Sequence, residues 1–276
     1  MNMYRIKFVT LVLILGGFLL LSCNNDNRGT SKILRIQNAN GELTEIEYKI
    51  ENKDTVFNGI GKYYSALGKI TDKVEFKNGL KNGWHEHFDS IGKLESKVFY
   101  VNGLAEGAAY FYDSKGKVIT EIFYINDKQV FSKKVHENTY LPEVYNMFNE
   151  SGDVQYVVLF DSTGNKFYEN GYIFDRSIKL KGFNSDFLRQ NKEINLKVFT
   201  TQLPEYSKKI DLYYYDNNNK RREISYQLKD SGYYVTIKFV PEILGSAAIV
   251  LVGKLNDANG KSVKYDTLLT KVNIVK

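Results

Sequence analysis

The feature that most constrains the fold of this chain is a repeat of 24 residues in its first half. Three blocks align without gaps, at 58–81, 82–105 and 106–129. Each block has a glycine at its second position, a large ring five residues after that glycine, and a Gly-Lys pair four residues after the ring; the rings are Tyr64, Phe88 and Tyr112. Self-similarity at a fixed period is the signature of a repeat architecture. The first half is therefore expected to use one small structural unit three times.

Each unit is expected to be a β-hairpin. The Gly-Lys glycine supplies the positive φ of a tight turn, and apolar residues then alternate at Val74 and Phe76 in the first block. The first two blocks end on Asn-Gly, a strong signal for a two-residue hairpin turn. One hairpin is marginal alone in water, but adjacent hairpins share an apolar face. The pattern therefore predicts a continuous antiparallel β-meander.

The order of these residues resembles bacterial MORN-type repeats of the second variant. The resemblance rests on the glycine, the ring followed by Asp, the Gly-Lys pair, the aromatic residue and Asn-Gly, over 58–129. The first block has Ser65 where the others have Asp89 and Asp113. The family implies a strongly twisted antiparallel sheet and does not imply an enzyme.

The repeat region is expected to extend over 34–175. A degenerate fourth copy at 142–165 keeps the internal spacings of Phe148, Gly152, Val158 and Phe160 but lacks the opening glycine. The join to the next domain is expected within 176–190, with a helical turn at 187–192.

The last third, 177–276, is expected to be an Ig-like β-sandwich. It holds about seven short segments of alternating apolar residues, the number typical of that fold. The clearest alternation runs from Tyr233 to Phe239. The continuous apolar run 247–252 predicts a central strand that is buried on both faces.

The N-terminus predicts a lipid anchor. Arg5 and Lys7 precede the uncharged run 8–21, which is shorter than the ~20 residues of a bilayer span and matches a secretory signal peptide. Leu20, Ser22 and Cys23 resemble the bacterial lipobox, in which the cysteine is acylated and the peptide is cut before it. The expectation is a signal peptide at 1–22, lipid on Cys23 and a tether at 23–33. Because Asn24 is not the Asp of an inner-membrane retention signal, the outer membrane is the expected location.

Composition narrows the classes of partner. The chain of 276 residues has a formal net charge of +6, which falls to +4 without Arg5 and Lys7, and its longest basic run is Lys220 to Arg222. So small a net charge, with no longer basic run, does not indicate a nucleic-acid-binding surface. With one cysteine, no intramolecular disulfide is available, so stability must come from buried cores.

His85 and His87 lie two residues apart, so a strand would place both imidazoles on one face. Such a pair is one half of a zinc or copper site, but His136 is the only other histidine. The repeat aligns the pair with Gly61 and Tyr63, which are ordinary sheet positions. We therefore interpret both histidines as ordinary surface residues of the sheet, and we expect no metal and no cofactor.

The aromatic columns have two interpretations, a shared core of the sheet or an open binding face. For the second, we expect Tyr63, His87 and Phe111 to line one open face together with Phe99 and Phe123. The full set of candidate partner-binding residues is Tyr63, Trp84, His85, His87, Phe99, Phe111 and Phe123.

The sequence thus predicts an all-β outer-membrane lipoprotein, lipid-anchored on the periplasmic face or at the cell surface. Its expected role is non-catalytic: a binding or scaffolding module for an envelope protein or a glycan. Two alternatives stay open. One is a carbohydrate-active enzyme, although acidic pairs such as Asp211 and Asp216 have no framing motif. The other is an antitoxin or immunity-like protein that holds a toxic partner.

Overall fold

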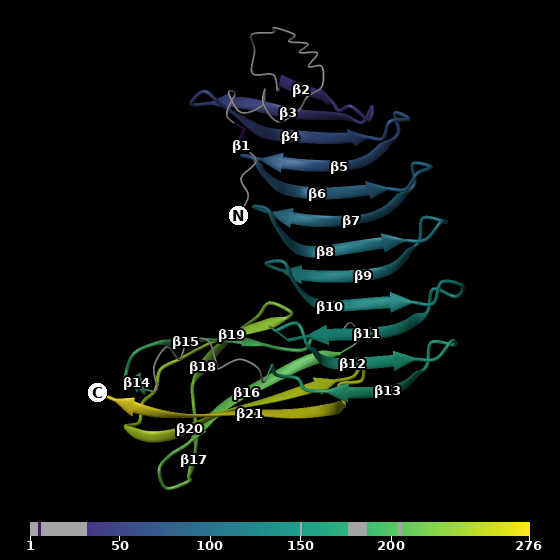
Figure 1. Ribbon diagram of the computed structural model, residues 1–276. Coiled ribbons are helices and arrows are strands. Elements are labelled where there is room, and N and C mark those ends of the chain that lie inside the picture. Colours follow the sequence, from purple (N-terminus) through teal and green to yellow (C-terminus); the bar gives the residue numbers. More distant parts are fainter. Residues whose placement is uncertain (1–4, 7–31, 150, 176–186, 204–205) are drawn as a thin grey trace. The chain divides into compact units, whose positions relative to one another are not determined.

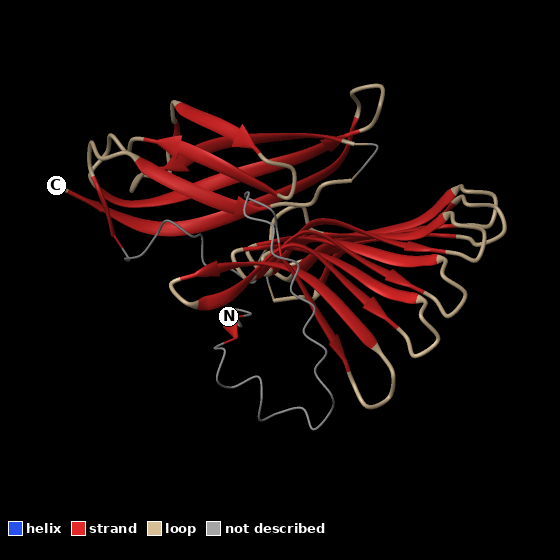
Figure 2. Ribbon diagram, turned by 90° about the horizontal axis from the view of Figure 1, so that it is seen from above, coloured by secondary structure: helices blue, strands red, loops and turns tan. Residues whose placement is uncertain are grey.

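The computed structural model describes residues 5–6, 32–149, 151–175, 187–203 and 206–276, and over these ranges the chain forms strands and no helix (Figures 1 and 2). The all-β fold class predicted from the sequence is confirmed. Cys23 and nearly all of the expected signal peptide and tether lie outside the described residues. No helix in the described ranges is long and apolar enough to cross a membrane.

The strands of the repeat region follow one another in a single antiparallel sheet. From β2 to β13 each strand is hydrogen-bonded to the next one in the chain, and β1 (Arg5–Ile6) pairs with β4. The strands of the first half are β2 (Lys32–Gln37), β3 (Leu43–Glu51), β4 (Asp54–Tyr64), β5 (Ile70–Lys77), β6 (Leu80–Phe88), β7 (Leu94–Val101), β8 (Leu104–Tyr112), β9 (Val118–Ile125) and β10 (Lys128–Val135). The predicted meander of hairpins is therefore present.

Two kinds of turn alternate along the meander, and both match the sequence signals. At the Gly-Lys turns, Gly68, Gly92 and Gly116 have φ between +74° and +87°. At the Asn-Gly turns, Asn78 and Gly79 both have positive φ, the combination that a type I′ hairpin turn requires. Asn102 and Gly103 repeat this geometry in the next block.

The 24-residue period also appears in the bonds between hairpins. Gly79 N donates to Phe57 O at 2.8 Å, and one period later Gly103 N donates to Lys81 O at 2.8 Å. The lysines of the Gly-Lys pairs add a second link, because Lys69 Nζ donates to Ser90 O and Lys93 Nζ donates to Ser114 O. The Gly-Lys motif thus makes the turn and also connects it to the next one.

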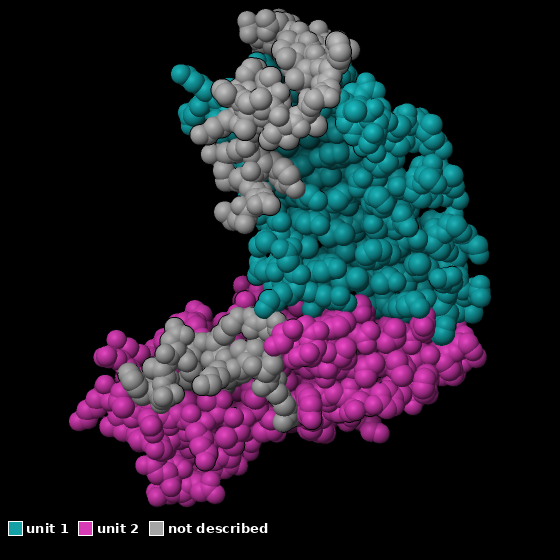
Figure 3. All heavy atoms as spheres, viewed as in Figure 1, with its two compact units in different colours: residues 1–129, 133–140 teal, residues 130–132, 141–276 magenta. Residues whose placement is uncertain are grey.

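The chain divides into two compact units, shown in Figure 3. Unit 1 is 1–129 with 133–140, and unit 2 is 130–132 with 141–276. This division does not coincide with the expected boundary near 176, because β11 (Pro142–Phe148), β12 (Val154–Phe160) and β13 (Lys166–Gly171) group with the C-terminal strands. Gln155 of β12 gives one reason, since its buried amide donates to Thr201 Oγ1 and to Ile173 O.

The degenerate copy at 142–165 keeps the hairpin. Strands β11 and β12 pair in antiparallel register, and Gly152 has φ +90° in the turn between them. Asn149 Oδ1 accepts from the amides of Ser151 and Asp153, as Asp89 Oδ1 does from Ile91 and Lys93. The turn chemistry therefore survives the loss of the opening glycine.

The rest of unit 2 contains the predicted Ig-like sandwich. One sheet has the order β14-β21-β20-β16-β17 and the other has β15-β19-β18. This distribution of strands, with β14 parallel to β21, is that of an Ig-type domain. The strands are β14 (Phe187–Arg189), β15 (Ile194–Phe199), β16 (Ser207–Tyr215), β17 (Arg221–Glu223), β18 (Tyr226–Asp230), β19 (Tyr234–Phe239), β20 (Gly245–Asn256) and β21 (Ser262–Val275).

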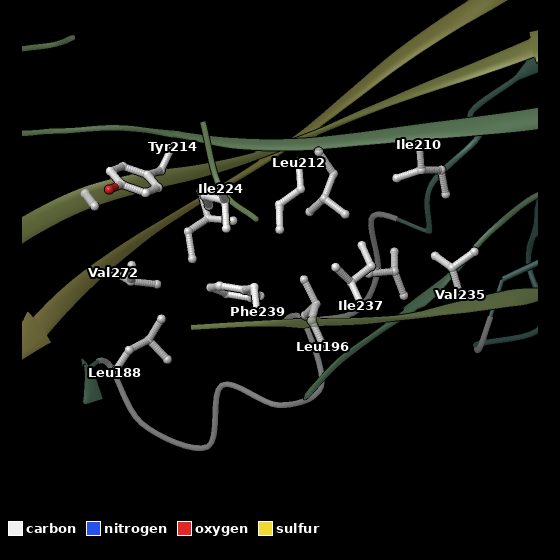
Figure 4. Packing of buried hydrophobic residues seen from close by; sticks show 14 of the residues in the cluster. Leu188, Leu196, Ile210, Leu212, Tyr214, Ile224, Val235, Ile237, Phe239 and Val272 are labelled. Carbon is white, nitrogen blue, oxygen red and sulfur yellow. The ribbon is translucent and has the colours of Figure 1, made fainter. Parts of the chain in front are cut away.

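A single apolar core lies between the two sheets (Figure 4). Leu212 of β16 and Leu251 of β20 meet Leu196 of β15 and Ile237 of β19 there, and each is at most 2 % exposed. The run 247–252 lies in β20 between β16 and β21, as predicted. The helical turn expected at 187–192 is wrong, because 187–189 is instead strand β14, which is held by pairing with β21.

Candidate functional site

Strand β6 departs from the other blocks on both of its faces. Where β6 has Trp84, His85, Glu86 and His87, the strand one period earlier has Ile, Gly, Lys and Tyr, and the strand one period later has Ala, Ala, Tyr and Phe. The aligned residues of the neighbouring blocks show which residue types the sheet itself requires at each position. The substitutions in β6 are therefore candidates for a role beyond folding.

The position of His85 shows this most clearly. One period earlier Gly61 makes room for a ring, since a Cβ added there would lie 2.9 Å from Phe76. One period later Ala109 is fully buried. His85 fills this small-residue position with an imidazole, whose centroid is 6.2 Å from that of Tyr100.

His85 and His87 meet at one carboxylate. His85 Nε2 and His87 Nδ1 each lie 3.0 Å from Asp72 Oδ1, because Asp72 is paired directly with His87 across β5 and β6. Lys81 Nζ lies 3.1 Å from His85 Nδ1. An ammonium group only donates, so Nδ1 accepts and Nε2 carries the proton that His85 donates to Asp72. The contacts thus select a neutral His85 in one tautomer.

The pKa values agree with this assignment. Burial lowers the pKa of His85, and the nearby Lys81 charge lowers it further against the opposing bond to Asp72. Burial would raise the pKa of Asp72, but hydrogen bonds from His87 and His85 outweigh it and leave the pKa below its usual value. Burial also lowers the pKa of Lys81.

We call His85, His87, Asp72 and Lys81 the histidine cluster. The cluster is not arranged as a metal site. Within the described ranges no group of three or more His, Cys, Asp or Glu side chains is placed to hold a metal ion. Beside the cluster, a hollow of ≈ 480 Å³ is lined by Tyr63, Thr71 and Asp72 together with residues of β2 and β3. The cluster combines hydrogen-bonding and charged groups with an adjoining recess.

The opposite face of β6 carries an aromatic cluster. The rings of Trp84 and Phe99 make an edge contact with centroids 5.2 Å apart, and the centroid of Tyr110 lies 6.2 Å from that of Trp84. Lys97 Nζ lies 4.6 Å from the centroid of Trp84 and 5.3 Å from that of Tyr110. We call Trp84, Phe99, Tyr110 and Lys97 the Trp84 cluster.

Ordered charges flank the Trp84 cluster. Lys73 Nζ and Glu86 Oε2 form an ion pair at 3.1 Å. In the register of β6 against β7, Glu86 lies directly opposite Lys97. The four side chains of the cluster are partly buried. The result is a ring surface with a cation over two of its rings and a carboxylate beside it, suited to stacking and to charge-assisted hydrogen bonds.

The expected single open face is wrong. The cross-strand registers place Tyr63, His85, His87 and Phe111 on one face of the sheet. They place Trp84, Phe99 and Phe123 on the other. The reason is the period of two along a strand, since Phe99 is paired with Trp84 whereas its neighbour Val98 is paired with His85.

Four residues of these clusters are absent from the sequence-based set: Asp72, Lys81, Lys97 and Tyr110. Their signal lay in the same repeat columns. Asp72 aligns with Ser96 and Thr120, so an acid there is peculiar to the first block. Its meeting with the histidines depends on the register of β5 against β6.

Comparison with known proteins adds little. No protein-family model matches the chain, and no curated protein matches it. Two solved structures of TarM, the second a mutant of the S. aureus protein in complex with Fondaparinux, alpha-GlcNAc-glycerol and UDP, align with TM-scores of 0.27 and 0.22 at 12% and 14% identity. They cover 42% and 44% of this chain, which spans only 19% and 20% of those chains.

Proposed function

We propose that this chain is a non-catalytic, lipid-anchored protein of the outer membrane that binds an envelope protein or a glycan. The anchor is the acylated Cys23, and the binding element is strand β6 in the middle of the meander. The Ig-like domain adds a second rigid module to the same anchored chain.

The observation that carries the proposal is the Trp84 cluster. A meander needs small or aliphatic residues at position 84, as Ile60 and Ala108 show in the neighbouring blocks. Trp84 instead packs against Phe99 and lies under the ammonium group of Lys97. Trp and Tyr are enriched in binding hot spots, and flat rings also stack on sugars.

Cross-linking of the intact protein in cells, followed by mass spectrometry, tests the proposal. The wild-type chain is expected to capture an envelope protein or glycan, and Trp84→Ala and Lys97→Ala are expected to reduce that capture several-fold. Phe167→Ala is the matched control, because Phe167 is a ring of β13 that is 66% exposed and lies outside the cluster. Equal capture by all variants with native circular dichroism would reject the assignment of the cluster.

A further inference from the structure

A second polar recess lies on the Ig-like domain. It has a volume of ≈ 530 Å³, within the range of ligand sites, and lies against the end of β16 and the adjoining parts of β20 and β21. Tyr215, Ala248 and Lys271 form one row across these strands. Tyr215 follows the core residue Tyr214, so it points to the outer face of the sheet. We call this recess the Tyr215 hollow.

The Tyr215 hollow has an aromatic wall and a shallow floor. Ser246, Ala247 and Ala248 are small, which leaves room beside the ring. The ring of Tyr215 makes an edge contact with Tyr213, with centroids 5.7 Å apart. Arg221 Cζ in turn lies 4.0 Å from the centroid of Tyr213. The wall is therefore held in place before any ligand arrives.

The rim of the hollow offers hydrogen-bonding groups. Ser246 Oγ donates to Asn273 Oδ1 at 2.8 Å, which leaves the amide hydrogens of Asn273 to donate elsewhere. Asn217 and Asn219 add two exposed carboxamides. A ring wall beside several amides and a hydroxyl complements a sugar, which has an apolar face and hydroxyl edges.

The lining of the hollow contains one carboxylate, that of Asp216, and one ammonium group, that of Lys271. The carboxylate of Asp216 is already satisfied by the amides of Asn218 and Lys220 and by Arg222 Nε at 2.9 Å. Lys271 is exposed, and no acidic side chain in the described part of the chain pairs with it. An incoming ligand therefore meets an unneutralised ammonium group, which favours a carboxylate.

From these observations we propose that the Tyr215 hollow binds a saccharide unit that carries a carboxylate, such as a hexuronic acid. The sugar ring stacks on Tyr215, its carboxylate pairs with Lys271, and its hydroxyls bond to Asn217 and Asn273. The inference is independent of strand β6, so its failure leaves the proposed function standing.

Isothermal titration of the full chain with trigalacturonate, and with neutral maltotriose, tests the inference. Trigalacturonate is expected to bind more tightly than maltotriose. Tyr215→Ala is expected to weaken binding about three- to tenfold, the worth of an aromatic contact. Lys271→Met is expected to weaken trigalacturonate binding about two- to fivefold and to leave maltotriose unchanged.

Tyr265→Ala is the matched control, because Tyr265 is a 62% exposed ring on β21 that does not line the hollow. It is expected to bind as the wild type does. No heat of binding with either sugar overturns the inference. Equal affinity for the two sugars overturns the assignment of the carboxylate to Lys271.

Discussion

Single side chains show where this chain departs from what its fold requires. His85 occupies a position that is Gly in one block and Ala in another, and it brings a partly buried imidazole between Lys81 and Asp72. Lys208 is a second case, because its side chain is only 2% exposed although it is charged. Both residues are held by specific partners, so the effect of replacing either one can be predicted.

The first prediction concerns pH. Burial lowers the pKa of His85 in the folded state, so the unfolded chain binds this proton more readily. The stability that His85 contributes is present above its unfolded pKa of about 6.5 and is lost as the pH falls through that value toward the lower folded pKa. In His85→Ala, thermal unfolding should depend less on pH than in the wild type between about pH 7.5 and about pH 5. Identical pH profiles for the two proteins would contradict this.

The second prediction concerns Lys208. Its Nζ lies 3.3 Å from Asp230 Oδ1 and donates to Thr200 Oγ1 and Gly232 O, both at 2.6 Å. Lys208→Ala removes the ion pair and both hydrogen bonds of the ammonium group, and should cost about 2–4 kcal/mol of unfolding free energy, measured by urea denaturation. Its neighbour Lys209 points outward with a side chain 64% exposed, so Lys209→Ala should cost no more than about 0.5 kcal/mol. Equal losses of unfolding free energy in the two variants would refute the assignment of Lys208 as a buried, stabilising ammonium group.

At the level of elements, the sequence predicted the hairpin turns but not which side chains share a face of the sheet. The glycines and asparagines that need positive φ are visible in the sequence, so the hairpins at 58–129 were predicted correctly. Which rings share a face depends on cross-strand register, and β-bulges such as the shift between Val74 and Phe76 alter it. Strand β14 was missed because it is only three residues long and pairs with a strand far along the chain.

The third prediction concerns one turn. Asp89 Oδ1 accepts from the amides of Ile91 and Lys93, at 2.9 and 2.8 Å. Asp89→Ala removes both bonds and should lower the unfolding free energy by about 1–2 kcal/mol. Asp89→Asn keeps an acceptor, as Asn149 does in its own turn, and should change the unfolding free energy by less than half as much. Both variants remove the carboxylate charge, so equal losses for Asp89→Asn and Asp89→Ala would show that the charge, not the turn bond, matters.

At the scale of the whole molecule, the chain combines a repeat sheet with an Ig-like sandwich. Alternating apolar residues predicted both, since each pattern reflects a local period of two. The grouping of β11–β13 with the C-terminal strands was not visible, because it depends on contacts such as that of Gln155 with Thr201.

The fourth prediction concerns the proposed anchor. Cys23→Ser removes the only sulfur that could be acylated at the lipobox, so the protein should leave the membrane fraction and become soluble. Ser65→Ala is a control that leaves the lipobox intact and should fractionate as the wild type does. Retention of Cys23→Ser on membranes after a high-salt wash would reject the anchor.

The measurement that tests the central claim most directly is the reactivity of lysines toward an acylating reagent, in intact cells and in the purified chain. Lys97 lies over Trp84, so a partner on that cluster must shield it. Lys115, an exposed turn residue, reports access of the reagent. The account predicts that Lys97 is protected several-fold in cells relative to the purified chain while Lys115 is not. Equal labelling of Lys97 in both settings, with Lys115 unchanged, would contradict it.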